Sequence, residues 1–267
     1  MGSNFLKEMA EASAARARAA MTLQSLASLR SRSFDTPPPK AVSLGDFGLI
    51  AEVKRSSPSE GVLAADSLDA LSQARTYADA GASMISVLTE PSRFGGSEDD
   101  LRQIARSVDV PVMRKDFLVD PYQVVEARAW GASAVLLIAR ILDDEDLRRM
   151  LNESEEMGLV VLVEAFDGED LERANAAIEG RANVLLGLNC RDLATLEEDV
   201  GRFREVVDRF PAGVPKIAES GIATGRDAAA VATLGYDGAL VGTALMRSDN
   251  PGALARAMIE AGRAARG

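Results

Sequence analysis

The chain has 267 residues, 47% of them hydrophobic, and its 30 Lys and Arg against 41 Asp and Glu give a formal net charge of −11. This acidic balance argues against binding to nucleic acid or to an anionic membrane, because both would be repelled over most of the surface. With no His and a single Cys, the chain can form no internal disulfide and has no good ligand set for zinc or a transition metal.

Acid-base chemistry would therefore use Lys, Glu or Asp, and a small anionic substrate is compatible with the composition if basic side chains converge locally. No apolar run approaches the roughly 18 residues of a membrane helix. The N-terminal segment also lacks the compact apolar core of a signal peptide. We expect a cytoplasmic protein with no membrane association.

The first predicted element is a helix over residues 4–32, where apolar residues recur at helical spacing without Pro or internal Gly. Pro37, Pro38 and Pro39 end it and start a stiff linker. We therefore predict a helical extension over residues 1–36 and a linker over 37–47. Both belong to a single domain that spans residues 1–267.

Short apolar runs rich in β-branched residues then recur along the chain. They lie at residues 49–54, 84–89, 111–116, 134–139, 160–165, 184–189, 216–220 and 238–243. The segments between them have room for one helix each, with apolar residues three and four apart. Eight such units match a (β/α)8 barrel better than an open doubly wound sheet, and no Gly-x-Gly-x-x-Gly follows the first run. The predicted fold is an α/β (β/α)8 TIM barrel with an additional N-terminal helix.

Charged and polar residues stand near the carboxyl ends of four predicted strands, where barrels carry their catalytic groups. Strand alternation turns Glu52, Lys54, Lys115, Glu164 and Asn189 toward the barrel axis. An alternative is that Glu52 only pairs with a lysine in a structural ion cluster. For the set as a whole we favour a catalytic cavity, in which crowding would move the Lys and Glu pKa values toward the working pH.

The last two strands end in turns that contain small residues. Glu219-Ser220-Gly221 closes the seventh strand and Gly242-Thr243 closes the eighth, which is where barrels often bind phosphate through backbone N–H groups. Ordinary βα turns also favour Ser, Thr and Gly. The position of both motifs together favours a phosphate site.

Several long motifs occur in one order along the chain. They are IAEVKRSSPSEG, SVLTEPSRFGGSEDDL, PVMRKDFLVDPYQVVEARAWGASAVLLIARIL, LVEAFDGEDL, GLNCRDLATLEED, AESGIATGRD and ALVGTALMRSDNPG. With these motifs the chain resembles indole-3-glycerol phosphate synthase from the N-terminal helix to about Pro251. The resemblance implies a carboxy-lyase that cyclises 1-(2-carboxyphenylamino)-1-deoxyribulose 5-phosphate to indole-3-glycerol phosphate, releasing carbon dioxide and water. It implies no metal or organic cofactor, and association with other tryptophan-pathway enzymes.

The resemblance also implies roles for individual residues. Lys115 resembles the general acid, Glu164 the general base of the later dehydration, and Lys54 the second lysine, which holds the substrate carboxylate. Glu52 and Asn189 resemble the groups that orient them. Ser220 belongs to the catalytic set and also to the phosphate and ribulose contacts. The other implied substrate contacts are Ser57, Arg191, Gly221, Gly242 and Thr243 for phosphate and ribulose, Glu219 in the site lining, and Phe94, Phe117 and Leu136 around the anthranilate ring.

Two residues depart from the family pattern, and three other functions remain open at this point. Glu60 stands where many relatives have Lys, and Cys190 where they often have Asn or Ser; we interpret Cys190 as a packing residue turned away from the substrate. The alternatives are another phosphosugar isomerase barrel, a Schiff-base aldolase, and a catalytically silent barrel that serves as a scaffold or binding subunit. The division of proton transfers between Lys54 and Lys115 also stays open.

Overall fold

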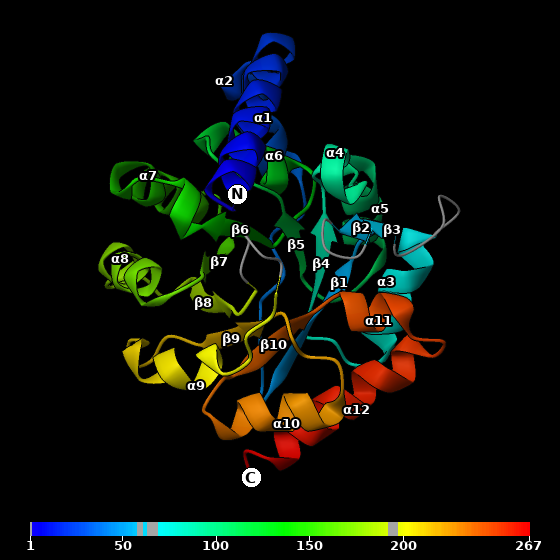
Figure 1. Cartoon of the computed structure of the whole chain (residues 1–267). Helices are drawn as coiled ribbons and strands as arrows, with labels where there is room; N and C mark the ends of the chain where they lie inside the picture. The colour runs from blue at the N-terminus through cyan, green and yellow to red at the C-terminus, as the bar shows by residue number, and fades with distance from the viewer. Residues whose placement is uncertain (1, 58–60, 63–68, 192–196) are drawn as a thin grey trace.

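The computed structural model describes residues 2–57, 61–62, 69–191 and 197–267. Within these parts, eight parallel strands close into a barrel in the order β1-β10-β9-β8-β7-β6-β5-β4 (Figure 1). The strands are β1 (Gly48–Val53), β4 (Met84–Leu88), β5 (Val112–Lys115), β6 (Ala134–Ile138), β7 (Val160–Ala165), β8 (Val184–Asn189), β9 (Lys216–Glu219) and β10 (Gly238–Val241). Each predicted apolar run forms one of them, so the (β/α)8 fold is confirmed.

Helices surround the strands as an outer layer (Figure 1). They are α3 (Ala70–Asp79), α5 (Glu98–Ser107), α6 (Pro121–Ala129), α7 (Asp144–Glu156), α8 (Gly168–Ile178), α9 (Arg202–Val206), α10 (Gly225–Thr233) and α12 (Pro251–Ala264). Most begin at a side chain that accepts a hydrogen bond from a backbone N–H of the first turn, as N-cap residues do. These caps are Asp69, Ser97, Asp120, Asp143, Asp167, Thr224 and Asn250.

Shorter elements lie in the loops. They are the antiparallel pair β2 (Ser56–Ser57) and β3 (Gly61–Val62), α4 (Pro91–Phe94), α11 (Thr243–Arg247) and the 3-10 turns η1 (Ala139–Ile141) and η2 (Val207–Arg209). The β2–β3 pair follows β1, and α4 and α11 follow β4 and β10. These three insertions therefore lie at the carboxyl end of the barrel.

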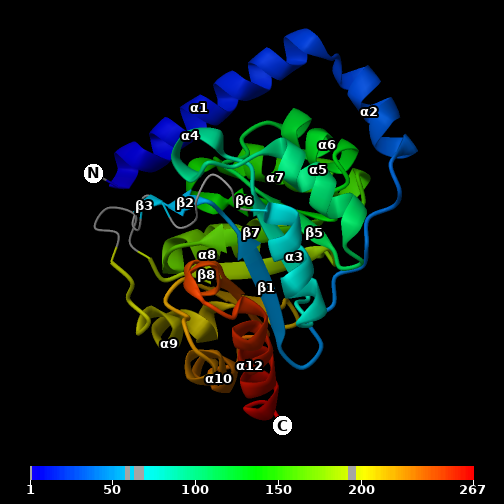
Figure 2. The same cartoon turned by 90° about the vertical axis from the view of Figure 1, so that its right-hand side faces the viewer.

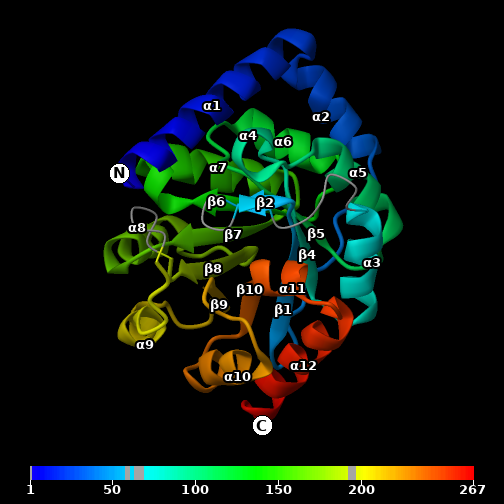
Figure 3. The same ribbon diagram turned by 45° about the vertical axis from the view of Figure 1, so that its right-hand side comes forward.

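The N-terminal extension is helical, but it is not the single helix predicted over residues 4–32. It forms α1 (Gly2–Leu23) and α2 (Leu26–Asp35), which meet at a sharp corner and bracket one side of the barrel (Figures 2 and 3). The corner forms because Ser25 is extended and caps α2 by accepting a hydrogen bond from Ser28 N. Ser25 signals the start of a second helix in the sequence, but the helical spacing of the apolar residues on either side of it predicted one continuous helix.

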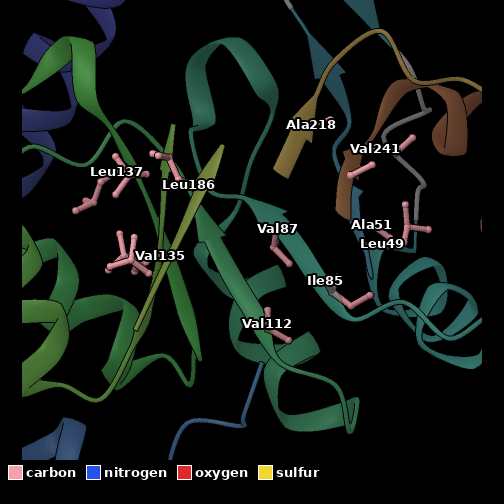
Figure 4. Packing of buried hydrophobic residues seen from close by; sticks show 14 of the residues in the cluster. Leu49, Ala51, Ile85, Val87, Val112, Val135, Leu137, Leu186, Ala218 and Val241 are labelled. Atoms are coloured by element: carbon pink, nitrogen blue, oxygen red, sulfur yellow. The ribbon is translucent and has the colours of Figure 1, made fainter. Parts of the chain in front are cut away.

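Strand alternation divides the buried apolar residues into two layers, as predicted. Residues that face the helices pack in the outer layer; Figure 4 labels Leu49, Ala51, Ile85, Val87, Val112, Val135, Leu137, Leu186, Ala218 and Val241. Their strand neighbours fill the barrel axis, among them Ile50, Met84, Met113, Leu162, Leu185, Ile217 and Leu240. Side chains at the carboxyl end of the inner layer therefore stand on a filled apolar floor.

Candidate active site

A cavity of about 410 Å³ opens at the carboxyl ends of the barrel strands. Fourteen of the fifteen predicted site residues line it: Glu52, Lys54, Phe94, Lys115, Phe117, Leu136, Glu164, Asn189, Arg191, Glu219, Ser220, Gly221, Gly242 and Thr243. The fifteenth, Ser57, belongs to β2, but its side chain is outside the described part of the structure. Glu60, the departure noted in the loop after β1, also lies outside the described residues.

Two lysines and a glutamate form a chain of ion pairs across this cavity. Glu52 Oε1 lies 2.8 Å from Lys54 Nζ, and Glu52 Oε2 lies 3.1 Å from Lys115 Nζ. Lys115 Nζ is also 3.5 Å from Glu219 Oε2. Gly242 leaves the room that this cluster needs, because a Cβ on Gly242 would overlap Glu52 Oε1. The pairing of Glu52 with lysine, which the sequence allowed as a purely structural ion cluster, is therefore present. It lies inside the cavity.

For Glu52 and Lys115 the ion pairs correct one expectation, that crowding moves the lysine and glutamate pKa values toward the working pH, whereas the pKa of Glu219 is raised as expected. Burial raises the pKa of Glu52, but the ammonium groups of Lys115 and Lys54 outweigh it and lower this pKa to about 2. Burial lowers the pKa of Lys115, but the carboxylates of Glu52, Glu219 and Glu164 outweigh it and raise this pKa above its usual range. Opposite charges about 3 Å apart favour the charged forms more strongly than burial disfavours them.

A second group of polar residues comes from β7, β8 and β9. Asn189 Nδ2 donates a hydrogen bond to Glu164 Oε1 over 3.2 Å, and Asn189 Oδ1 accepts one from Arg191 N over 3.0 Å. Gly187 lies on β8, between β7, which carries Glu164, and β9, which carries Glu219. A Cβ on Gly187 would overlap Glu219 Oε1. Glu164 and Glu219 are 3% and 1% exposed. The glycine thus leaves the space that the buried Glu219 carboxyl group occupies.

Unusual backbone geometry occurs where a phosphate site was predicted. Ser220 has φ of 68°, the only positive φ of a non-glycine residue in the described parts of the chain, and Gly221 continues the same turn. Such conformations cost energy and concentrate at binding sites, and consecutive left-handed residues turn backbone N–H groups toward a concavity that suits anions. Arg191 lines this end of the cavity and forms an ion pair with Glu198.

Apolar side chains form the opposite wall. The rings of Phe94 and Phe117 have centroids 6.0 Å apart, and Phe5 of α1 packs edge-on against Phe117 at 6.1 Å. Leu136 belongs to the inner layer and lines the cavity, whereas its neighbour Leu137 belongs to the outer layer. Strand alternation therefore distinguishes the two leucines, which have similar surroundings in the sequence.

Sequence reasoning missed several residues that line the cavity, among them Phe5, Leu6, Phe166 and Arg247. Alternation beyond Glu164 could have found Phe166, two residues further along the chain. Nothing local indicates that Phe5 and Leu6 reach the cavity, because α1 is placed by tertiary contacts. Arg247 lies one turn beyond Thr243 in α11, a short helix that the sequence pattern did not reveal.

Cys190 lies between two cavity residues but faces away from the cavity. It is fully buried in the outer layer, and burial raises the pKa of its thiol to about 12. A thiol in this state is a weak nucleophile. Its interpretation as a packing residue agrees with this placement.

A larger cavity, of about 1030 Å³, lies at the opposite end of the barrel, beside the first residues of β7, β8 and β9. It is lined by Val160, Val184 and Lys216 among others, and by none of the predicted site residues. Barrel enzymes use the carboxyl face for catalysis. The smaller cavity is therefore the candidate active site.

Two further features are not found in the described parts of the chain. There, no group of three or more His, Cys, Asp and Glu side chains is arranged to hold a metal ion. In the same residues, no helix combines the length and the apolarity that crossing a bilayer requires.

Solved structures share the fold at low sequence identity. 3-Hexulose-6-phosphate synthase from Salmonella typhimurium superposes with a TM-score of 0.65 at 17% identity, over 80% of this chain and 98% of that one. Orotidine 5'-phosphate decarboxylase from Pyrococcus horikoshii OT3 gives a TM-score of 0.60 at 18% identity, over 80% and 99%. At such identities the likeness shows the barrel fold alone.

Sequence relatives are much more similar. Indole-3-glycerol phosphate synthase of Mycobacterium avium (strain 104) is 43% identical over 244 residues, which cover 90% of this chain and 88% of the relative. The protein of the same name from Beutenbergia cavernae is 47% identical over 216 residues, covering 81% and 78%. The family model described as indole-3-glycerol phosphate synthase matches residues 5–258. The chain therefore belongs to the indole-3-glycerol phosphate synthase family.

Proposed function

We propose that this protein is an indole-3-glycerol phosphate synthase that converts 1-(2-carboxyphenylamino)-1-deoxyribulose 5-phosphate to indole-3-glycerol phosphate, carbon dioxide and water. The carrying observation is the placement of Lys54, Lys115 and Glu164 around one cavity, between a Ser-Gly turn and an aromatic wall. A substrate with a phosphate at one end and an aromatic acid at the other fits this order of surfaces.

Lys115 is the proposed general acid of ring closure. Its ion pair with the Glu52 carboxylate keeps it charged, so an ammonium faces the cavity. The alkoxide that develops on the substrate carbonyl is a stronger base than a lysine amine, so it can take the proton even from an ammonium with a raised pKa. Before that transfer, the positive charge stabilises the developing anion in a partly dry site.

Lys54 is proposed to bind the substrate carboxylate until carbon dioxide leaves. Glu52 bonds to Lys54 and to Lys115, so one carboxylate fixes the separation of the two ammonium groups. Glu164, held by Asn189, is the proposed base that removes the ring proton during dehydration and rearomatisation. These groups come from different strands and reach the substrate from different sides.

The remaining predicted residues are proposed to bind and orient the substrate. Phosphate is assigned to the turns at Ser220-Gly221 and Gly242-Thr243, together with Arg191. The anthranilate ring is assigned to Phe94, Phe117 and Leu136, while Glu219 lines the ribulose segment between the two ends. Ser57 is also assigned to the phosphate on the family resemblance.

Substitution of the proposed acid and base tests this function. Lys115→Ala and Glu164→Gln are each expected to lower kcat by about 10²- to 10⁴-fold, the usual contribution of a positioned acid or base. Lys216→Ala is the matched control, because Lys216 lines the opposite cavity. Turnover near the wild-type value in correctly folded Lys115→Ala would contradict the proposal.

Two alternatives make different predictions. A Schiff-base aldolase would give a covalent adduct when borohydride is added with substrate, whereas the proposed mechanism gives none. A catalytically silent scaffold is not supported, because the chain matches synthases over nearly its whole length and the acid-base side chains share one cavity. Cytoplasmic location and association with other tryptophan-pathway enzymes stay predictions, which fractionation and co-purification would test.

A further inference from the structure

Glu219 is a buried carboxyl group with one oxygen unpaired. Its Oε2 lies 3.5 Å from Lys115 Nζ, but its Oε1 is buried and has no hydrogen-bond partner among the residues that the structure describes. A buried carboxylate oxygen without a donor is costly. If this oxygen carries a proton, it becomes a hydrogen-bond donor and needs an acceptor nearby.

An acceptor is available on the next strand but one. Glu164 pairs with Gly187 across β7 and β8, and Asn189 pairs with Glu219 across β8 and β9. The Glu219 carboxyl group occupies the space above Gly187, where a Cβ would overlap its Oε1. Gly187 therefore removes the side chain that would otherwise separate the Glu219 and Glu164 carboxyl groups.

The charge balance of the cluster also favours a proton on one of these carboxyl groups. Three carboxyl groups (Glu52, Glu164 and Glu219) face two ammonium groups (Lys54 and Lys115), and Glu52 binds both lysines. One shared proton on Glu164 and Glu219 makes this cluster neutral, whereas full ionisation leaves a buried charge of −1 where an anion has to bind. The remaining charged lining residues are Asp116, Arg191, Glu198 and Arg247; Asp116 pairs with Arg16 and Arg114, and Glu198 with Arg191.

The surroundings of Glu219 favour its neutral form. Burial raises the pKa of Glu219 well above its ordinary value, and the carboxylate of Glu164 raises it further, with Lys115 opposing and Glu52 adding to the rise. From β10, the strand paired with β9, the facing residue Leu240 is apolar. Among the described residues, none of these neighbours donates a hydrogen bond to Glu219 Oε1, so a proton on this oxygen is what satisfies it.

We propose that Glu219 is a neutral carboxylic acid that donates a hydrogen bond to Glu164, and that it acts as a positioning residue for the base and for binding of the anionic substrate. The positioning role of Glu219 rests on the proposed synthase function, but the protonation state of Glu219 does not. When the shared proton leaves at high pH, the two carboxylates repel each other and the incoming substrate. The Michaelis constant of the wild-type enzyme should then rise.

Spectroscopy of the substrate-free enzyme tests the protonation state directly. Infrared difference spectra of wild type at neutral pH, measured against Glu219→Gln, should show the carbonyl band of a protonated carboxyl that the variant has lost. Glu164→Gln, which changes the acceptor, should shift this band. Absence of a protonated carboxyl band in the wild type, or a band that Glu164→Gln leaves unchanged, overturns the proposal. The band of the wild type and its shift in Glu164→Gln remain measurable even if Glu219→Gln does not fold, and none of these spectra depends on the identity of the substrate.

Kinetics test the positioning role. Glu219→Gln keeps a neutral donor of the same shape, so at neutral pH it should retain at least about tenfold more of the wild-type kcat/KM than Glu219→Ala does. The rise in KM at high pH should be absent from Glu219→Gln and present in Glu153→Gln, a control at a buried carboxyl group on α7 outside the cavity. A Gln variant as impaired as the Ala variant, or one with the wild-type pH profile, contradicts the proposal.

Discussion

Acid titration of Glu52 offers a quantitative test of the charged cluster. The pKa of Glu52 falls from 4.5 to about 2 when the chain folds, because two ammonium groups outweigh burial. Between these values the unfolded chain binds more protons than the folded one, so stability rises with pH across this window. One pKa unit corresponds to about 1.4 kcal/mol, so ionised Glu52 contributes about 3 kcal/mol at neutral pH, of which about 2 kcal/mol is lost by about pH 3.

Urea unfolding of wild type and Glu52→Gln from about pH 6 to about pH 3 measures this contribution. The single tryptophan, Trp130, is buried against Arg114 and reports unfolding by fluorescence. The difference in unfolding free energy between the two proteins should shrink by about 2 kcal/mol on acidification. The exposed Glu260→Gln should show no such change. A difference between wild type and Glu52→Gln that is constant over this range, or that grows, would refute the ion-pair account.

Two further substitutions test the packing around the site. Arg16→Ala removes the 2.6 Å ion pair to buried Asp116 and the 3.6 Å pair to buried Glu90, so urea unfolding should show a loss of about 1–3 kcal/mol in one cooperative transition if extension and barrel form a single folding unit. The exposed Arg18→Ala is its control, and equal stability of the two variants would contradict this role. Cys190→Ala should keep wild-type kcat and lose about 1 kcal/mol of stability; a large fall in kcat would show that the thiol has a catalytic role.

Strand alternation accounts for most of what the sequence could predict. Glu52, Lys115 and Glu164 are charges at apolar strand ends, and parallel strands of a barrel bring such ends together whatever lies between them in the chain. The fold and the place of these three side chains in the cavity follow from this pattern.

Features that depend on distances were beyond the sequence. The directions of the pKa changes of Glu52 and Lys115 depend on ion pairs of 2.8 to 3.5 Å, and alternation gives only a shared face. The reach of Phe5 into the cavity depends on the corner at Ser25 and on Arg16, since both set the path of α1. Tertiary contacts, rather than local propensity, decide these features.

The central claim is that this cavity closes an indole ring with loss of carbon dioxide. Purified wild-type protein supplied with 1-(2-carboxyphenylamino)-1-deoxyribulose 5-phosphate should develop indole fluorescence and release one carbon dioxide for each indole-3-glycerol phosphate formed, without added metal or organic cofactor. Failure of folded wild-type protein to form the indole, or indole formation without stoichiometric carbon dioxide, would contradict the account.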